Sequence, residues 1–218
     1  MFWILFLAHL LGDYVFQPNW LVANKHRRWG LTLHAAIHFL LMFTLVGKTR
    51  LHLLPQLGAL TLAHLAIDAM KLYFAQKRPA TGRSAYFIDQ AAHLILIAAI
   101  ACWIERSVPL NLAFESSTWA AIACGYILVT SAWATTERLF TINEPQYHHE
   151  VIVQTWPRMI SRAVMLTVWL VLAQSNGSIT LLFAANLPYL SGKYRLRTLL
   201  TDVAVTLVTA VIVLLANA

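Results

Sequence analysis

Long apolar segments alternate with short polar segments along almost the whole chain. An α-helix needs about 20 residues to cross roughly 30 Å of hydrocarbon. The segments that approach this length are residues 2–23, 31–47, 55–75, 85–104, 117–136, 159–175, 178–191 and 199–216. The seventh is short and contains Asn186 and Pro188. The pattern therefore predicts an all-α, polytopic membrane helix bundle with seven or eight transmembrane helices.

The composition supports a membrane protein. Of the 218 residues, 59% are hydrophobic and only 11% are charged, whereas a soluble domain carries about 25% charged residues. The lipid bilayer is therefore the expected surrounding. The first apolar segment contains His9, Asp13 and Gln17 and follows no Lys or Arg. We therefore expect it to remain in the mature protein rather than to be cleaved as a signal peptide.

The net charge of +7 does not indicate a nucleic-acid partner, because the basic residues lie between apolar segments and not on one soluble face. Alternate helix junctions hold 13 of the 16 basic residues, and the other junctions hold Lys48, Arg50 and Arg106. The 13 are Lys25, Arg27, Arg28, Lys71, Lys77, Arg78, Arg83, Arg138, Arg158, Arg162, Lys193, Arg195 and Arg197. Because basic loops stay in the cytoplasm, we expect a multi-pass protein with both termini extracytoplasmic.

A repeat with an offset of 55 residues relates the first four predicted helices. Residues 7–13 read LAHLLGD and residues 62–68 read LAHLAID. The offset carries His9, Asp13, His34 and His38 onto His64, Asp68, Asp89 and His93. Since 55 residues contain two membrane crossings, the two copies have the same orientation, and parallel repeats of this kind share a site at their interface. We expect residues 1–105 to form two hairpins around a polar centre, and residues 106–218 to add further helices to the same membrane domain.

These eight ionisable positions are the candidate functional centre. They hold three of the four aspartates and five of the nine histidines, in segments where a charged group is disfavoured by about 2.5–3.5 kcal/mol or more. Six of them come out in one layer, about 8–16 Å from the cytoplasmic helix ends: Asp13, His38, His64, Asp68, Asp89 and His93. His34 falls nearer the cytoplasmic end and His9 nearer the outer half. A hydrogen-bonded network that only joins the helices is the structural alternative.

Imidazole and carboxylate groups together are typical ligands of divalent transition metals, and helix bundles build metal sites from inward-facing residues spaced i, i+4. We therefore expect zinc, manganese or iron, one or two ions per chain. Three protein ligands and an open position would make such a site catalytic. Lys71 lies one turn beyond Asp68, and we expect it to extend to the membrane interface rather than to pair with Asp68; it is the only basic side chain expected near the centre.

Three features outside the centre are assigned structural roles. Cys102 and Cys124 lie inside apolar segments and are expected to fill the core. His148-His149-Glu150 is expected to be a solvated loop rather than a second metal site.

Three functions fit these residues. The first is a membrane-embedded, metal-dependent hydrolase that acts on a lipid or another membrane-soluble substrate. The second is a transporter or channel for metal ions or protons, since pumps also use buried Asp and His residues. The third is a non-catalytic assembly or regulatory subunit. The residues alone do not decide between enzyme and transporter, nor between a monomer and a homo-oligomer.

The pattern of the first half resembles a bacterial membrane family of unknown function, DUF3307. The resemblance rests on His9-Leu10-Leu11-Gly12-Asp13 with Gln17, on Asn24-Lys25, on His34 with His38, on His64 with Asp68 and Lys71, and on Asp89-Gln90 with His93. Lys193-Tyr194-Arg195 is similar to the family's ending, whereas Ser161-Arg162 stands where a Glu-Arg pair is expected. The resemblance implies a bacterial inner-membrane location and no particular activity.

Overall fold

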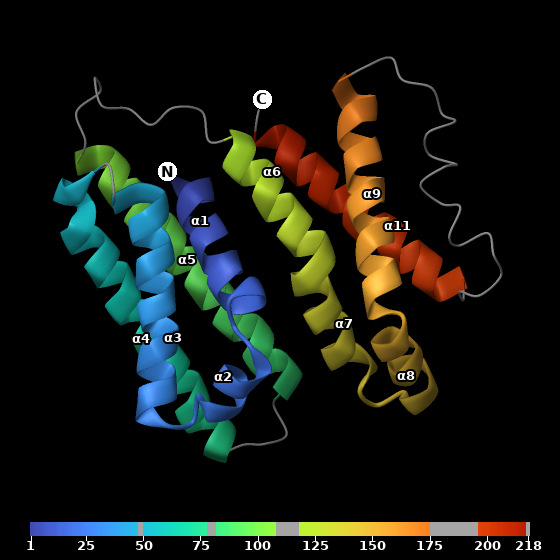
Figure 1. Ribbon diagram of the computed structural model, residues 1–218, viewed down its shortest axis with the longest axis horizontal. Coiled ribbons are helices and arrows are strands. Elements are labelled where there is room, and N and C mark those ends of the chain that lie inside the picture. The colour runs from blue at the N-terminus through green and yellow to red at the C-terminus, as the bar shows by residue number, and fades with distance from the viewer. Residues whose placement is uncertain (48–49, 78–81, 108–117, 175–195, 217–218) are drawn as a thin grey trace. The chain divides into compact units, whose positions relative to one another are not determined.

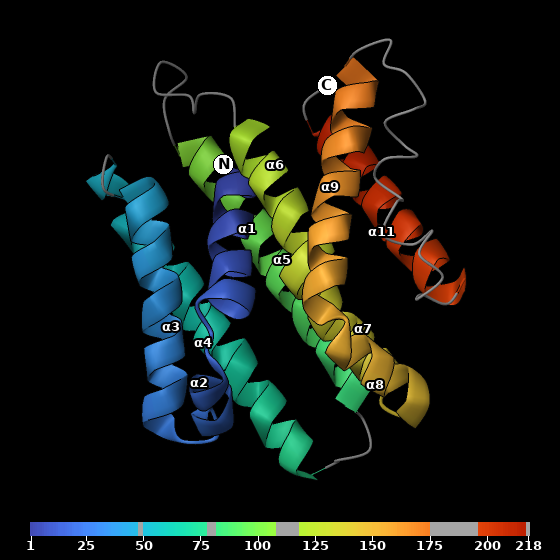
Figure 2. The ribbon, with the colours of Figure 1, turned by 45° about the vertical axis from the view of Figure 1, so that its right-hand side comes forward.

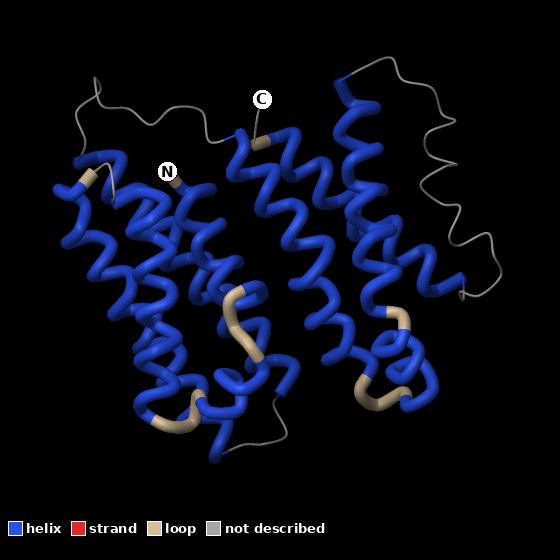
Figure 3. The backbone as a smooth tube through the Cα atoms, viewed as in Figure 1, coloured by secondary structure: helices blue, strands red, loops and turns tan. Residues whose placement is uncertain are grey.

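In the computed structural model of the protein, the described residues are 1–47, 50–77, 82–107, 118–174 and 196–216. Within these ranges every regular element is a helix (Figures 1 and 3). The predicted all-α fold is therefore confirmed. The chain forms two compact units, Met1–Ala120 and Ala121–Ala218.

Four long helical segments build the first unit. Its elements are α1 (Phe2–Leu10) continued by η1 (Leu11–Val15), α2 (Asn19–Asn24), α3 (Arg28–Met42) continued by η2 (Phe43–Gly47), η3 (Leu51–Leu53), α4 (Leu54–Lys77) and α5 (Gly82–Ser107). Contacts join α1 to α3, α3 to α4, α4 to α5 and α5 back to α1, and both views show this arrangement (Figures 1 and 2). This closed order gives the four helices a common interior. That the hairpins 2–47 and 57–102 superpose stays a prediction.

In its described residues, the second unit has one long interrupted helix and three further helices. The interrupted helix runs through α6 (Thr118–Ile127), η6 (Leu128–Ala132) and α7 (Trp133–Thr141). It is followed by α8 (Pro145–Val153), α9 (Thr155–Gln174) and α11 (Leu196–Leu215). α9 packs against both α11 and η6, so these three elements enclose the core of this unit around Val129, Leu166 and Ala210.

Six helical segments among the described residues are long and apolar enough to cross a membrane: Arg28–Val46, Leu51–Phe74, Arg83–Ser107, Thr118–Thr141, Thr155–Ala173 and Leu196–Leu215. Apolar side chains such as Leu62, Ile88, Ile95 and Val208 are exposed on their outer faces, as expected for helices surrounded by hydrocarbon. The helices thus indicate a multi-pass membrane protein. The predicted span 178–191 lies outside the described residues, so seven or eight spans stays a prediction.

The first predicted span, residues 2–23, is too long. The helix ends at Val15, and α2 begins as a separate short helix at Asn19, which leaves an apolar helix over Phe2–Val15. Pro18 explains the break, because proline has no amide hydrogen and disfavours a helical conformation in the residue before it. Pro18 itself is extended, at φ −67° and ψ 156°.

Two further expectations outside the centre are wrong. The segment with His148 and Glu150 is the helix α8 and not a loop, because Pro145 at its first turn starts a helix well. His148 Nδ1 lies 3.0 Å from Thr141 Oγ1, and Glu150 accepts a hydrogen bond from Thr198 at 3.2 Å. Of the cysteines, Cys124 is buried as predicted, but Cys102 is exposed on the outer surface of α5.

Four charged side chains are buried inside the second unit, and the sequence analysis missed them. Arg158 and Arg162 were counted with the basic residues of the junctions, yet both are only 1% exposed. Arg158 donates to both carboxylate oxygens of Asp202, at 2.7 and 2.9 Å, and to Glu137 at 2.8 Å. Arg162 donates to Asp202 at 2.9 Å. Two guanidinium groups and two carboxylates therefore compensate one another. At the edge of this network, the Tyr147 hydroxyl donates to Glu137, and burial raises the pKa of Tyr147.

Asp202→Asn should destabilise the protein strongly, because it leaves two buried guanidinium groups with Glu137 as the carboxylate that remains. Removing one partner of a buried ion pair lowers the free energy of unfolding by about 3–5 kcal/mol. Glu144→Gln is the matched control. It breaks the Arg197–Glu144 pair, whose side chains are 56% and 46% exposed, and should change stability by less than about 1 kcal/mol. Thermal unfolding of both full-length variants in one detergent measures this difference, and equal shifts would contradict it.

Candidate metal centre

All eight predicted positions lie in the first unit and point into its common interior. His9 and Asp13 are on α1 and η1, His34 and His38 on α3, His64 and Asp68 on α4, and Asp89 and His93 on α5. Seven of the eight are buried, and the Asp13 side chain is 12% exposed. The bundle therefore brings the eight positions together from four helices.

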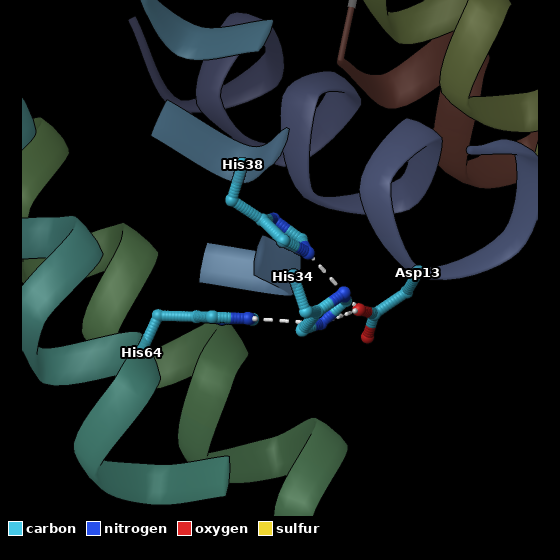
Figure 4. Close-up of side chains that lie close together, drawn as sticks. All are labelled: Asp13, His34, His38 and His64. Carbon is cyan, nitrogen blue, oxygen red and sulfur yellow. Dashed lines mark hydrogen bonds and ion pairs between the residues drawn. The ribbon is translucent and has the colours of Figure 1, made fainter. Parts of the chain in front are cut away.

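The Asp13 carboxylate faces the His34 and His38 rings in the first group of ligand atoms (Figure 4). Its Oδ1 atom is 3.1 Å from His38 Nε2 and 3.2 Å from His34 Nε2. His64 Nε2 in turn lies 3.4 Å from His34 Nε2. One ligand atom from each of these four residues lies within 4.8 Å of the others, which is close enough for a single ion to bind them together.

A second group shares His64 with the first. It consists of His64, Asp68 and His93, again with one ligand atom of each within 4.8 Å of the others. His64 Nε2 is 3.7 Å from Asp68 Oδ2, and His93 Nε2 is 3.8 Å from Asp68 Oδ1. His34 also reaches this carboxylate, at 3.3 Å from Asp68 Oδ2. The two groups thus form one continuous centre with two adjacent places for a cation.

The two groups contain the same residues as the predicted layer, except that His34 takes the place of Asp89. His34 belongs to the first group, although its depth placed it at the edge of the layer. Asp89 lies outside both groups. Its backbone carbonyl lies 2.8 Å from His93 Nδ1. A proton on Nδ1 fits this contact and leaves His93 Nε2 free to bind a cation. Metal-bound histidines commonly donate their other ring N–H to a backbone carbonyl in this way.

The histidine rings pack against one another and against an apolar pocket. The His38 and His64 ring centres are 4.0 Å apart, and those of His64 and His93 are 4.2 Å apart. With His9, these three rings line a narrow pocket that has room for about one water molecule. Its other lining residues are Leu5, Met42, Leu60, Leu96 and Ile97. The imidazole groups thus meet an apolar surface on one side.

The sequence of the first 123 residues matches a known family model, which is described as a protein of unknown function, DUF3307. The match covers more than half of the 218 residues and all eight positions of the centre. The chain belongs to the DUF3307 family. No curated protein and no solved structure matches it. Since the family description states no activity, the function has to be derived from the residues.

Two lysines of this DUF3307 protein pair with the carboxylates, contrary to the sequence analysis. Lys71 Nζ donates to Asp89 Oδ2 at 2.6 Å; it neither extends away from the centre nor pairs with Asp68. Lys25, which the sequence analysis assigned to a helix junction, lies 3.5 Å from Asp68 Oδ2. The sequence analysis preferred the membrane interface for Lys71 over a pair with Asp68, but α5 brings Asp89 within reach.

Three further polar residues reach the centre of the DUF3307 chain and were missed. Gln90 donates to Asp13 Oδ2 and to Asp89 Oδ2, both at 3.3 Å. Tyr14 donates to Gln90 Oε1 at 3.2 Å, and the Tyr14 and Tyr86 hydroxyls are 2.7 Å apart. Gln90 therefore holds one oxygen of each of two carboxylates. Its place directly after Asp89 in the family pattern was the one signal available from the sequence.

The local backbone around Asp13 brings it against His38. In η1 the amide of Phe16 donates to the carbonyl of Leu11, five residues back, at 2.8 Å. The corresponding hydrogen bond in an α-helix reaches back four residues, so this turn contains one extra residue. Gly12 precedes Asp13, and a Cβ atom there would overlap with the His38 ring. The absence of a side chain at Gly12 thus lets α1 and α3 approach closely enough for the Asp13–His38 contact.

Gly12→Ala should displace the His38 ring and break its 3.1 Å contact with Asp13. We expect metal content to fall by at least about half, since a shift of a ligand or of its supporting group weakens metal binding about 10–100-fold. Gly58→Ala on α4 is the matched control, because nothing lies within 4 Å of a Cβ atom there. Elemental analysis and thermal unfolding of both variants in one detergent provide the comparison. Loss of metal in both variants, or in neither, would contradict the assigned role of Gly12.

Proposed function

We propose that this DUF3307 protein is a multi-pass metalloprotein of the bacterial inner membrane, with both termini extracytoplasmic. Its first four helices bind one or two divalent transition-metal ions, and it acts as a hydrolase on a lipid-like substrate. The observation that carries the proposal is the pair of ligand groups that share His64, each with its ligand atoms within 4.8 Å of one another.

Unpartnered polar atoms favour a metal centre over a purely structural hydrogen-bonded network. Among the described residues, four buried atoms of the centre have no hydrogen-bond partner: His34 Nδ1, Asp68 Oδ2, Asp89 Oδ1 and His93 Nε2. Leaving a buried polar atom without a partner costs about 1–3 kcal/mol. Asp68 Oδ2 lies 3.3 to 3.7 Å from His34, Lys25 and His64 but accepts no hydrogen bond. Asp68 and His93 belong to the second ligand group, so one cation there would satisfy both residues.

The ligand types limit the choice of metal. The two groups contain imidazole nitrogens and carboxylate oxygens and no sulfur. Such sets suit zinc, manganese and iron, whereas thiolates select for softer ions and oxygen-only sets suit magnesium and calcium. An Nε2 atom that carries a proton must lose it before it binds a metal ion, so metal binding becomes more favourable as the pH rises.

The pocket that the histidines line has room for about one water molecule and favours hydrolysis, and the exposed apolar side chains of the helices favour a lipid-like substrate. A bound divalent ion would lower the pKa of a water molecule to about 7 and polarise the bond under attack. His9 lines the same pocket and belongs to neither ligand group, so its imidazole can accept the proton that the water loses. Leu5, Leu60 and Ile97 in the pocket wall exclude bulk water from the histidine rings.

Proton transport is less well supported. The chain Tyr86, Tyr14, Gln90 and Asp13 is connected by hydrogen bonds, but it passes through the amide of Gln90. An amide nitrogen donates its hydrogens and has no lone pair ready to accept a proton, so it does not relay protons as a hydroxyl or water does. Gln90 fits better as a fixed support for two carboxylates.

Metal content tests the proposal. We expect the purified wild-type protein to hold about one or two transition-metal ions per chain. Asp68→Ala with His93→Ala should remove at least one of them, because it deletes two of the three ligands in the second group. His148→Ala with His149→Ala, on α8, should retain the wild-type content.

Elemental analysis of the three proteins in one detergent decides the outcome. If the wild type carries no stoichiometric metal even after supplementation, the metalloenzyme fails, and a proton relay or a neutral hydrogen-bonded core takes its place. If only the α8 variant loses metal, the wrong histidines have been assigned.

A further inference from the structure

Two lysine side chains lie at one end of the metal centre. Lys25 follows α2, and Lys71 is on α4 between Asp68 and the end of that helix. In the first unit, α2, the start of α3, the end of α4 and the start of α5 share this end (Figure 1). The Lys25 and Lys71 side chains are 17% and 36% exposed, against 7% and 2% for Asp68 and Asp89. The ammonium groups therefore lie between the buried carboxylates and the exterior.

The charges at this end of the centre do not balance once a metal ion is bound. With neutral imidazoles, three carboxylates and two lysines leave one negative charge. One divalent ion turns this into one positive charge, and two ions turn it into three. A net charge inside helices surrounded by hydrocarbon is costly. The metal-loaded centre therefore attracts an anion, and the lysines are the cations that an entering anion meets.

Hydrogen-bond donors gather around the same place. Lys71 Nζ and Gln90 Nε2 both donate to Asp89 Oδ2, at 2.6 and 3.3 Å. The hydroxyls of Tyr14 and Tyr86 are next to Gln90. An oxyanion that replaces a carboxylate oxygen here would find an ammonium group, an amide and hydroxyls within reach. Lysine ammonium groups are frequent phosphate ligands in proteins.

Large apolar side chains are exposed at the same end of the first unit. Exposed large apolar residues at this end of the unit are Phe16, Trp20, Val22 and Trp29, and the rings of Trp20 and Trp29 stack with their centres 6.5 Å apart. Exposed tryptophans are typical of the membrane interface, where lipid headgroups lie. A ligand with an anionic group and acyl chains fits both the lysines and this surface.

We propose that the substrate of the centre is an amphiphile with a phosphate headgroup, and that Lys25 and Lys71 bind the phosphate. This proposal rests on the metal centre described under the proposed function. It explains why two lysines are held against buried carboxylates at the exposed end of the site.

Ligand binding to the full-length protein in one detergent tests this. The probes are dioleoyl phosphatidic acid, dioleoylglycerol and inorganic phosphate, each with metal-loaded and with chelator-treated protein. We expect the loaded protein to bind phosphatidic acid at least about tenfold more tightly than dioleoylglycerol, because of the charged hydrogen bonds. Inorganic phosphate should bind at least about tenfold more weakly than phosphatidic acid, because it has no acyl chains to cover apolar surface.

Matched variants identify the residues. Lys25→Gln with Lys71→Gln should weaken phosphatidic acid binding about tenfold or more, and Lys25→Arg with Lys71→Arg should keep it within about threefold. Arg50→Gln with Arg106→Gln removes the same charge at the opposite end of the unit and should leave binding unchanged. Thermal unfolding of each sample shows that it is folded.

Metal content, measured on the same samples, separates the two proposals. If the wild type holds no metal, the proposed function fails. If it holds metal but does not prefer phosphatidic acid to dioleoylglycerol, the phosphate proposal alone is wrong. Binding that is unchanged by the glutamine pair, or unchanged by the chelator, also overturns it. Phosphate that binds as tightly as phosphatidic acid would replace the amphiphile with the free anion.

Discussion

Carboxylates inside helices surrounded by hydrocarbon need a compensating cation or several hydrogen-bond donors, because the lipid offers neither. The first unit meets this need differently for each carboxylate. Asp89 pairs with Lys71, Asp68 with Lys25 and three histidines, and Asp13 with histidines and Gln90. Asp13 is the one of the three without a lysine within ion-pair distance in the described structure. The first ligand group, which contains Asp13, is therefore where a divalent cation is needed most.

Two contacts recur at an offset of 55 residues in the sequence. His9 contacts Asp13 as His64 contacts Asp68, at 3.6 and 3.7 Å. His38 likewise contacts Asp13 as His93 contacts Asp68, at 3.1 and 3.8 Å. The two halves differ at one position, where the first has His34 and the second has Asp89. His34 contacts the carboxylates of Asp13 and Asp68, whereas Asp89 pairs with Lys71. This asymmetry gives the centre an end with lysines and an interior with histidines.

The sequence predicts most of the described long helices, and it names eight side chains that the structure places in one interior, because hydropathy and the i, i+4 spacing are local properties. It does not predict Lys25, Gln90 or Tyr14 in the centre, since their contacts depend on how α2 and α5 pack. Arg158, Arg162 and Asp202 look like charges near helix ends, and only the packing of α9 against α11 shows that they are buried together. Pro18 marks the break in the sequence, but the apolar residues on both sides of it favoured one continuous span.

X-ray absorption fine structure at the metal edge of the purified full-length protein tests the central claim most directly. The account predicts a first shell of nitrogen and oxygen at about 2.0–2.2 Å, with the multiple scattering that imidazole rings produce and no sulfur at about 2.3 Å. It also predicts that Asp13→Asn with His38→Ala reduces the imidazole signal while His148→Ala with His149→Ala leaves it unchanged. A sulfur shell, a shell of oxygen atoms without imidazole, or a spectrum insensitive to the changes at Asp13 and His38 would contradict the assignment of the centre.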